Sequence, residues 1–534
     1  MWKHIITASS LGVALHHGLF ITGEWHLQAP QILAAHVGVP LLLYATNRVF
    51  LSTAEVTLLL AVYFTTILAS IGVYRLYFHR LRNYPGPRLA ALSKLWLVWK
   101  CRDSRCYEVL ENLRKEYGPF VRTGPNEITV FDANIHEIMD GAQNKNTRSD
   151  WYDLLYPRIS SIFTRNKLVH NARRKMWENA LNNVTLPQHY QTIMSQVRTL
   201  MDLIDSYGEN TITVNQLIYW FAFDNMGSFG FGQEFGSMKN RRAVDGAVFM
   251  RSAMTLLGPF SPAIWIPRIG FAFIPGLWKV RDWFRMLEWA DKCMKTRMNM
   301  TPENPTDISQ CFIDEYRRRG GDTKINYQLL SGDTATLMVA GSDTSAPSLI
   351  LLLYALARYP EHAAQIQEEL KGVDITDVKA LTNLEHLNGT INESMRLYPS
   401  ILSFGSRVTP PEGLVVGDTV LPGEITVVAP RYSIGRLPTA YKDPESFVPE
   451  RWYSRPDMII ERRAFAPFGL GRTACVGKNL ALAQLRLASA NLLSRYNIRL
   501  AGDEKDHDAA VRDLKDQLTA NPGKLQLRFE KRDV

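Results

Sequence analysis

One stretch decides the fold of this chain: Phe468-Gly469-Leu470-Gly471-Arg472-Thr473-Ala474-Cys475-Val476-Gly477. Its glycines allow tight turns and let the backbone come close to a flat ligand. The helical run Lys478 to Leu493 follows at once, so the first amides of the predicted helix lie near the sulfur and favour the thiolate. This setting suits a cysteine that ligates a metal. If Cys475 is considered without the other motifs, it could equally well be a small apolar residue buried in the core.

The other cysteines form no pattern. They show neither a CxxC pair nor a regular spacing, and they are Cys101, Cys106, Cys293 and Cys311. We therefore expect from them neither a disulfide framework nor a zinc site.

A second motif is Ala340-Gly341-Ser342-Asp343-Thr344-Ser345, inside an apolar run from Leu329 to Leu356 that predicts a long, mostly buried helix. Polar side chains in a buried helix are costly unless they are satisfied, so Asp343 and Thr344 indicate a proton path. Pro347 cannot donate a hydrogen bond to the carbonyl of Asp343, which predicts a local distortion of the helix. The alternative is an ordinary serine and threonine patch.

A third motif combines a helix with a distant turn. Glu393 and Arg396 stand three residues apart, so they share a helix face and can pair. Such pairs usually contribute little on a surface. A further arginine, Arg451, stands in the sequence Phe447-Val448-Pro449-Glu450-Arg451-Trp452 and could join them.

A fourth motif is the basic run His170-Asn171-Ala172-Arg173-Arg174, which precedes Trp177. His170 and Arg174 stand four residues apart, and an arginine there could bind a carboxylate through charge-assisted hydrogen bonds. Basic helix faces are usually only solvated, so this motif is informative chiefly in combination with the other motifs.

Together, and in this order, the motifs resemble the cytochrome P450 family over roughly residues 80 to 530. The resemblance implies a mainly α fold with small β-sheets, the cytochrome P450 fold. It implies haem b as cofactor, with Cys475 as the axial thiolate ligand of the iron. It also implies that Glu393, Arg396 and Arg451 form a structural triad that supports the haem loop.

The resemblance assigns roles to further residues. Asp343 and Thr344 are expected to relay protons during oxygen activation. The cofactor-binding residues expected besides Cys475 are His170, Arg174, Arg407, Phe468, Gly471, Arg472 and Gly477. The chain departs from the family at Thr473, where the usual haem loop carries an arginine, and Arg472 stands one step earlier.

The substrate pocket is also inferred from family position. The expected lining is Trp151 to Phe163, Met338, Val339, Ile401 to Phe404 and Leu518 to Ala520. Most of these side chains are apolar, so we expect a lipophilic substrate, although several of them could equally belong to the core.

The N-terminal region predicts a membrane anchor. No charged residue lies between Glu55 and Arg75, a run of 19 residues that would span about 28 Å as a helix. Two earlier runs without formal charge, His4 to Gly23 and Trp25 to Asn47, either span the membrane or lie at its interface. The anchor therefore has one to three spans, and three spans would place the N-terminus in the lumen.

Basic residues follow the third run: Arg75, His79, Arg80, Arg82 and Arg88. By the positive-inside rule this flank faces the cytosol. We expect an anchor over residues 1–80 and a haem-thiolate catalytic domain over residues 81–534. The expected location is the endoplasmic reticulum membrane, with the catalytic domain in the cytosol. The Pro- and Trp-rich stretch Gly258 to Trp278 is expected to interrupt the helices, either as a segment that contacts the membrane or as an internal loop that covers the core. The stretch Asp503 to Asp516 is expected to be a charged, solvated tail.

Composition agrees with an enzyme that depends on a partner. The 534 residues are 46% hydrophobic, which supports a large core. No GxGxxG or Walker-type loop is visible, so electrons are expected from NADPH-cytochrome P450 reductase, with cytochrome b5 as a second possible donor. The net charge of +9 comes without a basic stripe interleaved with aromatics, so nucleic acid is not an expected partner. An anionic membrane surface and an acidic reductase fit better.

The expected function is a monooxygenase that oxidises a lipophilic small molecule with O2 and electrons from NADPH. The long hydrophobic N-terminus and the run after Cys475 resemble filamentous-fungal members, many of which modify terpenoids, polyketides or alkaloids. Two alternatives stay open: a haem-thiolate isomerase or dehydratase that needs no O2, and a non-catalytic membrane haem-binding protein.

Overall fold

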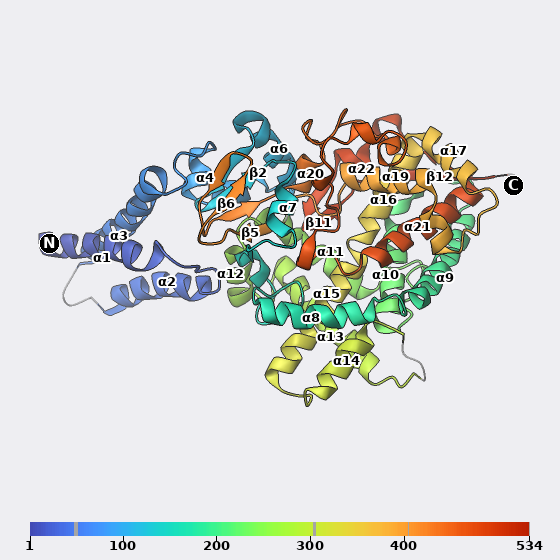
Figure 1. Ribbon diagram of the computed structural model, residues 1–534. Coiled ribbons are helices and arrows are strands. Elements are labelled where there is room, and N and C mark those ends of the chain that lie inside the picture. The colour runs from blue at the N-terminus through green and yellow to red at the C-terminus, as the bar shows by residue number, and fades with distance from the viewer. Residues whose placement is uncertain (47–51, 303–305, 404, 533–534) are drawn as a thin grey trace.

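The computed structural model describes residues 1–46, 52–302, 306–403 and 405–532. The structure has three parts: a group of N-terminal helices that projects from the body, a small β-rich region, and a large helical body (Figure 1). The described residues form a mainly α fold with four small sheets, as the sequence predicts.

The projecting part consists of α1 (Trp2–Leu15), η1 (His16–Phe20), α2 (Ala29–Thr46), α3 (Thr53–Val73) and η2 (Tyr74–Phe78). α3 begins with a capping box in which Ser52 and Glu55 bond each other's backbone amides. α1 packs along α3, and the hydroxyl groups of Ser9 and Thr66 lie 3.2 Å apart. Residues Ala29–Thr46 and Thr53–Phe78 are long and apolar enough to cross a membrane, and little of either is buried. A third helix of that length and composition, Lys324–Arg358, is mostly buried, so its apolar character belongs to the core.

The segment between η1 and α2 contacts the body at the loop over residues 149–166. The carboxylate of Glu24 pairs with the guanidinium of Arg165, and Nε2 of His26 lies 2.9 Å from Oδ2 of Asp153. Asp153 also pairs with Arg165 at 3.3 Å. The segment between η1 and α2 therefore lies at the end of the N-terminal helices that faces the body.

The β-rich region is built on a five-stranded sheet of order β1-β2-β8-β5-β3. Its strands are β1 (Phe120–Gly124), β2 (Glu127–Val130), β3 (Thr147–Arg148), β5 (Ser406–Val408) and β8 (Thr426–Val428). Neighbours are antiparallel except β2 and β8, which run parallel with Ile128 beside Val427. The hairpin β6 (Leu414–Val416) and β7 (Thr419–Leu421) and the helices α4 (Arg88–Leu92), α5 (Leu95–Lys100), α6 (Cys106–Tyr117), α7 (Ile135–Asp140) and α20 (Arg431–Ile434) complete the region. The sequence predicts strands over residues 120–122, 128–131 and 405–430, and strands lie there, whereas β3 was not predicted.

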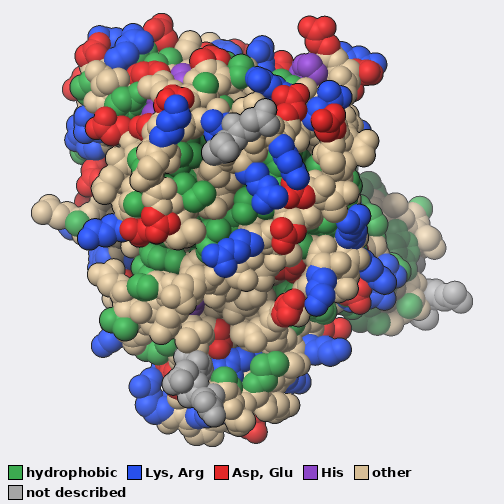
Figure 2. All heavy atoms as spheres, turned by 90° about the vertical axis from the view of Figure 1, so that its right-hand side faces the viewer, with side chains coloured by type: hydrophobic (Ala, Val, Ile, Leu, Met, Phe, Trp, Pro, Cys, Tyr) green, Lys and Arg blue, Asp and Glu red, His purple; other side chains and the backbone are tan. Residues whose placement is uncertain are grey.

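The helical body surrounds a single large core. Its helices are α8 (Lys167–Ala180), α9 (Leu186–Asp205), α10 (Val214–Phe231), α11 (Asp245–Phe260), α12 (Trp265–Phe273), α13 (Trp278–Met298), α14 (Ser309–Arg318), α15 (Lys324–Ser342), α16 (Ser345–Arg358), α17 (Pro360–Glu369), α18 (Val378–Thr382), α19 (Glu385–Leu397), α21 (Lys478–Arg495) and α22 (Ala509–Arg512). A three-stranded sheet joins β4 (Ile212–Thr213), β12 (Gln526–Lys531) and β9 (Tyr496–Leu500), and β10 (Lys515–Gln517) pairs with β11 (Thr519–Asn521). The face of the body turned away from the N-terminal helices carries charged side chains of both signs (Figure 2).

The predicted central helix is interrupted where the sequence indicates. α15 ends at Ser342, α16 begins at Ser345, and Asp343 and Thr344 form a turn between them. Pro347 is the third residue of α16, where a backbone amide has no partner within the helix. Because the helix is broken before Ser345, the missing amide hydrogen of Pro347 costs no hydrogen bond.

Two expectations about local structure are wrong. The stretch Gly258 to Trp278 is largely helical, because α11 continues through Pro259 to Phe260, and Pro267 lies in the first turn of α12, where proline is tolerated. The tail from Asp503 to Asp516 is not wholly solvated, since the side chain of Asp516 is 1% exposed.

Candidate active site

A cavity of about 380 Å³ lies between the α15–α16 break and the loop that carries Cys475. Of the predicted site residues, those that line it are His170, Arg174, Thr344, Arg407, Phe468, Cys475 and Gly477. Asp343, Gly471 and Arg472 do not line it. The structure therefore brings together residues that are up to 307 positions apart in the chain, from His170 to Gly477.

Cys475 lies at the end of a tight loop directly before α21. Its backbone amide donates to the carbonyl of Phe468 at 2.7 Å, and the amide of Gly477 points at its sulfur. Among the five cysteines only Cys475 is exposed, and its side chain faces the cavity. Burial raises the pKa of the thiol, whereas the Gly477 amide and Arg174 lower it. The helix-end amides therefore do not suffice to make a thiolate, and a bound metal ion would supply the remaining stabilisation.

Gly471 holds the loop close to the helix α7. It adopts a φ of +56°, and a Cβ atom added there would lie 2.1 Å from the carbonyl oxygen of Asp140. Only glycine fits both conditions, so Gly471 shapes the loop rather than lining the cavity.

Arginines crowd one end of the cavity: Arg148, Arg174, Arg407 and Arg431 all line it. Arg174 donates to the carbonyl of Ala474 at 2.6 Å, which ties α8 to the cysteine loop. Arg407 donates to the carboxylate of Asp140 at 2.7 Å and to the hydroxyl of Tyr152 at 2.6 Å. A cavity with a cysteine sulfur on its wall and cations at its edge fits a flat iron cofactor with anionic side arms.

Arg431 is, with Arg148, a functional candidate that sequence reasoning missed. It begins α20, directly after Pro430, and its Nε donates to the carbonyl of Ala466 at 3.0 Å. A Cβ atom added at Gly405 would lie 3.5 Å from its Nη1, and one added at Gly469 4.0 Å from its Nη2. Burial lowers the pKa of Arg431, so the protein holds a costly cation beside the cysteine loop.

Thr473 takes part in the same corner. Its hydroxyl lies 3.3 Å from Oδ1 of Asp140 and accepts from Arg407 at 3.3 Å. The side chain of Arg472 is exposed, and its carbonyl lies 3.2 Å from Nε2 of His170. Arg431 and Arg148 thus provide positive charge where the loop itself has threonine.

His170 links two loops around the cavity. Its Nδ1 lies 2.7 Å from the carbonyl of Ser161, and its Nε2 faces the carbonyl of Arg472. Burial lowers the pKa of His170, and the positive charge of Arg148 lowers it further. A neutral imidazole can donate to only one of the two carbonyls, so the other is left for a different donor.

The opposite wall is the break between α15 and α16. The hydroxyl of Thr344 donates to the carbonyl of Ala340 at 2.9 Å, and Thr344 lines the cavity. The carboxyl of Asp343 points behind this wall and accepts a short hydrogen bond from the hydroxyl of Thr519, which does line the cavity. Burial raises the pKa of Asp343 to about 6, although Thr519 and Arg251 act to lower it. The hydroxyl of Thr519 therefore connects the carboxyl of Asp343 to the cavity.

The remaining wall is apolar. The predicted lining residues that do face the cavity are Trp151, Tyr152, Leu154, Leu155, Ser161, Ile162, Phe163, Val339, Ile401, Leu518 and Thr519. Met338 and Ala520 belong to the core, and Phe404 lies outside the described residues. Sequence position did not indicate the side chains that α10, α11 and α13 add: Phe229, Met254, Trp283 and Met286.

The structure also brings the three residues of the expected triad together, away from the cavity. Glu393 accepts from Arg396 at 2.7 and 2.9 Å, and from Nε of Arg451 at 2.9 Å. The carboxylate also accepts from the indole of Trp452 at 3.0 Å. All three charged side chains are fully buried, so each depends on the others. They hold α19 against η4 (Pro449–Trp452).

Comparison with known proteins agrees with this geometry. The sequence profile of the Cytochrome P450 family matches residues 85–529. The chain is 33% identical to Cytochrome P450 monooxygenase FCK2 of Fusarium pseudograminearum, over 98% of this chain and 96% of that protein. It is 32% identical to Tryprostatin B 6-hydroxylase of Aspergillus fumigatus, over 94% of this chain and 92% of that protein.

A solved structure shares the fold. The retinoic acid-bound cyanobacterial CYP120A1 superposes with a TM-score of 0.65, covering 79% of this chain and 94% of its own, at 18% identity. The family match covers most of the chain, and the relatives match along nearly their whole length. The protein belongs to the cytochrome P450 family, whose members bind haem through a cysteine thiolate.

Proposed function

We propose that this protein is a haem-thiolate monooxygenase that hydroxylates or otherwise oxidises a lipophilic fungal secondary metabolite. The observation that carries the proposal is one cavity with the sulfur of Cys475 on one wall and the helix break at Thr344 on the other. The relatives, two of which are a Cytochrome P450 monooxygenase and a Tryprostatin B 6-hydroxylase, support the same reaction class. When bound, the thiolate-ligated haem supplies oxygen activation.

The side chains around the cavity have distinct tasks in this proposal. Cys475 would bind the iron through its sulfur, and the cations Arg148, Arg174, Arg407 and Arg431 would bind the acidic groups of the cofactor. Phe468 and Gly477 shape the cysteine wall. Thr344 presents a hydroxyl to the cavity, and Asp343 exchanges its proton with the cavity side through Thr519.

The substrate class follows from the lining. Aromatic and sulfur-containing side chains from several elements face the cavity, so the substrate is lipophilic and contacts the protein mainly through apolar surface. The same side chains exclude water from the oxidised position. The chemical group, such as a terpenoid, a polyketide or an alkaloid, is left to experiment.

A second cavity supports entry from the membrane side. It measures about 720 Å³ and lies between the N-terminal helices and the body, with Phe20, Ile32 and Phe64 on one side. Trp151 and Gly405 line both this cavity and the one at Cys475. A lipophilic substrate that partitions into the membrane would therefore meet the outer cavity first. We place the anchor in the endoplasmic reticulum membrane and the body in the cytosol, where NADPH-cytochrome P450 reductase supplies electrons.

Comparative mass spectrometry of the source organism with and without this gene tests the proposal. We expect one compound to disappear and a precursor lacking one oxygen to accumulate. The accumulated precursor is then given to the purified protein with the reductase, NADPH and O2. Conversion without NADPH and O2 would instead establish an isomerase or a dehydratase. Absence of both conversion and a substrate-induced spectral change would indicate a non-catalytic haem protein.

A variant at the helix break sharpens the same assay. Thr344→Ala removes the hydroxyl that faces the cavity, and we expect less product for each NADPH consumed, with the difference released as hydrogen peroxide. Ser348→Ala serves as the control, since that hydroxyl bonds the carbonyl of Thr344 one turn further on. Equal yield of product per NADPH in the wild type and Thr344→Ala would remove the proton-handling role of Thr344.

A further inference from the structure

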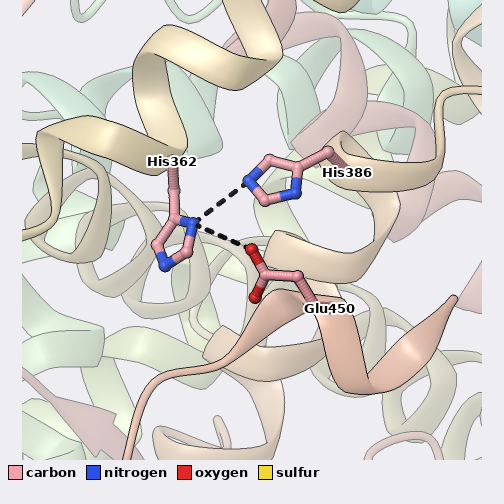
Figure 3. Close-up of side chains that lie close together, drawn as sticks. All are labelled: His362, His386 and Glu450. Carbon is pink, nitrogen blue, oxygen red and sulfur yellow. Dashed lines mark hydrogen bonds and ion pairs between the residues drawn. The ribbon is translucent and has the colours of Figure 1, made fainter. Parts of the chain in front are cut away.

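A cluster of metal-ligand side chains lies outside the active site, behind the triad. It consists of His362 on α17, His386 on α19 and Glu450 on η4 (Figure 3). Nδ1 of His362 lies 3.1 Å from Nε2 of His386 and 3.8 Å from Oε1 of Glu450. The three donor atoms all lie within 4.8 Å of one another. Three elements thus aim one ligand atom each at a common point.

The spacing of these atoms suits a tetrahedral ion. Zinc binds nitrogen and oxygen ligands at about 2.0–2.2 Å, which places two ligand atoms of a tetrahedron about 3.3–3.6 Å apart. The distance between the two imidazole nitrogens is slightly shorter than this, and the distance from His362 to Glu450 is slightly longer. A small rotation of each side chain would therefore bring all three within bonding distance of one ion.

A set of surrounding contacts fixes His386 in the orientation that a ligand needs. Its Nδ1 lies 2.9 Å from the hydroxyl of Tyr453, which also accepts from Nε2 of Gln365 at 3.3 Å. When Nδ1 carries the hydrogen and donates to Tyr453, the lone pair of Nε2 points into the cluster. Histidines that bind metals usually have such a partner on the second nitrogen.

The backbone around the cluster is also held in place. The amides of His386 and Leu387 donate to the carboxylate of Glu369 at 2.7 and 2.9 Å, which fixes the start of α19. A Cβ atom added at Gly389 would lie 2.7 Å from the carbonyl oxygen of Pro449, so glycine allows η4 to approach α19 closely. The ligand positions of His386 and Glu450 are therefore set by rigid elements.

Solvent access and the types of ligand both favour a transition-metal ion at this cluster. The side chain of Glu450 is 26% exposed, whereas His386 is 1% exposed, so solvent reaches the cluster from the glutamate side. Two imidazoles and one carboxylate favour zinc and similar transition metals over magnesium or calcium, which prefer oxygen ligands. One position of the tetrahedron is left for a water molecule.

We propose that His362, His386 and Glu450 bind one Zn²⁺ ion, which joins α17, α19 and η4. The ion would lie next to the scaffold that supports the cysteine loop, because α19 also carries Glu393 and Glu450 precedes Arg451. Its role is to stabilise this part of the fold. The site shares no residue with the cavity, so it stands independently of the proposed reaction.

The test uses the purified, haem-containing full-length protein without a histidine tag. Zinc is added, and the unbound excess is removed by dialysis. The bound metal is then measured by mass spectrometry, and the affinity is measured separately by calorimetry. We expect one zinc per chain and a thermal midpoint that rises with zinc concentration. In His362→Gln and Glu450→Gln we expect the affinity to fall at least tenfold and the zinc-dependent rise of the midpoint to disappear.

Matched controls separate this site from adventitious binding. His189→Gln removes a buried histidine on α9, and Glu445→Gln removes an exposed carboxylate near η4, and both should bind zinc like the wild type. Because Glu450 is partly exposed, Glu450→Gln is expected to fold, which an unchanged spectrum of the haem verifies. Absence of stoichiometric zinc in the wild type, or equal binding in all variants, would show that the two histidines only share a hydrogen bond.

Discussion

At the scale of single residues, Arg431 tests how the cavity holds its cofactor. It is a partly buried cation that lines the cavity beside the cysteine loop, where the loop itself carries Thr473. Loss of one charge-assisted hydrogen bond costs about 1.5–3 kcal/mol, which corresponds to about ten- to hundredfold in affinity. We therefore expect Arg431→Gln to speed haem transfer to an excess of an apo-acceptor protein by at least about tenfold.

The control for this prediction is Arg462→Gln, which removes an exposed arginine of the same charge. Equal transfer rates for the wild type and both variants would show that Arg431 does not hold the cofactor. An unchanged circular dichroism spectrum of Arg431→Gln would show that any faster transfer is not caused by unfolding.

Asp343 makes a second prediction at this scale, on pH. Its pKa is raised from an ordinary value of about 3.9 to about 6, so the folded protein keeps a proton there that the unfolded chain has lost. The stability tied to this proton is complete below about pH 4 and is lost as the pH rises through about 6. Asp343→Asn has no such loss.

We therefore expect Asp343→Asn and the wild type to have similar stability near pH 4, and the variant to gain up to about 3 kcal/mol relative to the wild type by pH 7. Thermal unfolding of both proteins across this range checks the prediction. A difference that stays constant with pH would mean that Asp343 titrates as it does in water.

Single residues also show what the sequence could and could not predict. Cys475 and the Glu393, Arg396 and Arg451 set stand in motifs whose spacing along the chain is itself informative. Arg431 carries no such signal, because it reaches the cavity only through the path of the chain after β8. The contact between Asp343 and Thr519 was equally invisible, since 176 positions separate them and the β10–β11 turn brings them together.

At the scale of elements, the contact between the N-terminal segment and the loop over residues 149–166 makes a third prediction. Glu24 and Arg165 form a two-point ion pair, and Glu24 is 44% exposed. Exposed ion pairs contribute about 0.2–1 kcal/mol, so Glu24→Ala should loosen the loop without unfolding the protein. We expect faster amide hydrogen exchange over residues 150–165 of the membrane-reconstituted protein.

The double variant Glu24→Arg, Arg165→Glu exchanges the two charges and should restore much of the protection of these amides from exchange. Glu368→Ala is the control, because it breaks an exposed ion pair with Lys371 far from this loop. Unaltered exchange in Glu24→Ala would mean that the N-terminal segment does not restrain the loop over the cavity.

Elements also show where sequence patterns succeed. The break after Ser342 was predictable because Pro347 removes a particular hydrogen bond. The helical character of residues 258–278 was not, because the same residue type is harmless near a helix end, and only the fold decides where α11 ends and α12 begins. The prediction of strands over residues 405–430 is confirmed, since turn residues separate short β-branched runs there.

At the scale of the whole molecule, the contacts of the N-terminal segment constrain how the chain crosses the membrane. Glu24 and His26 contact the body, so the start of α2 and the end of η2 lie on the same side of the membrane if α2 and α3 both span it. Ser52, at the start of α3, then lies on the lumenal side. The basic residues after η2 are the reason for our proposal that the body faces the cytosol.

Labelling of microsomes with an impermeant thiol reagent tests this topology. We expect Gln28→Cys to react in intact microsomes and Ser52→Cys to react only after the membrane is permeabilised. Both positions are exposed in the structure, so equal intrinsic reactivity is expected once the membrane is open. Reaction of Ser52→Cys in intact microsomes would contradict a membrane-crossing hairpin of α2 and α3.

The central claim is that Cys475 binds the iron of a haem in the cavity between α8, α15 and the loop before α21. The most direct measurement is the absorption spectrum of the reduced carbon monoxide complex of the wild type, Cys475→His and the control Cys311→Ala. We predict the thiolate-type band in the wild type and Cys311→Ala, and its loss in Cys475→His with haem still bound. A thiolate-type band that persists in Cys475→His would contradict the account.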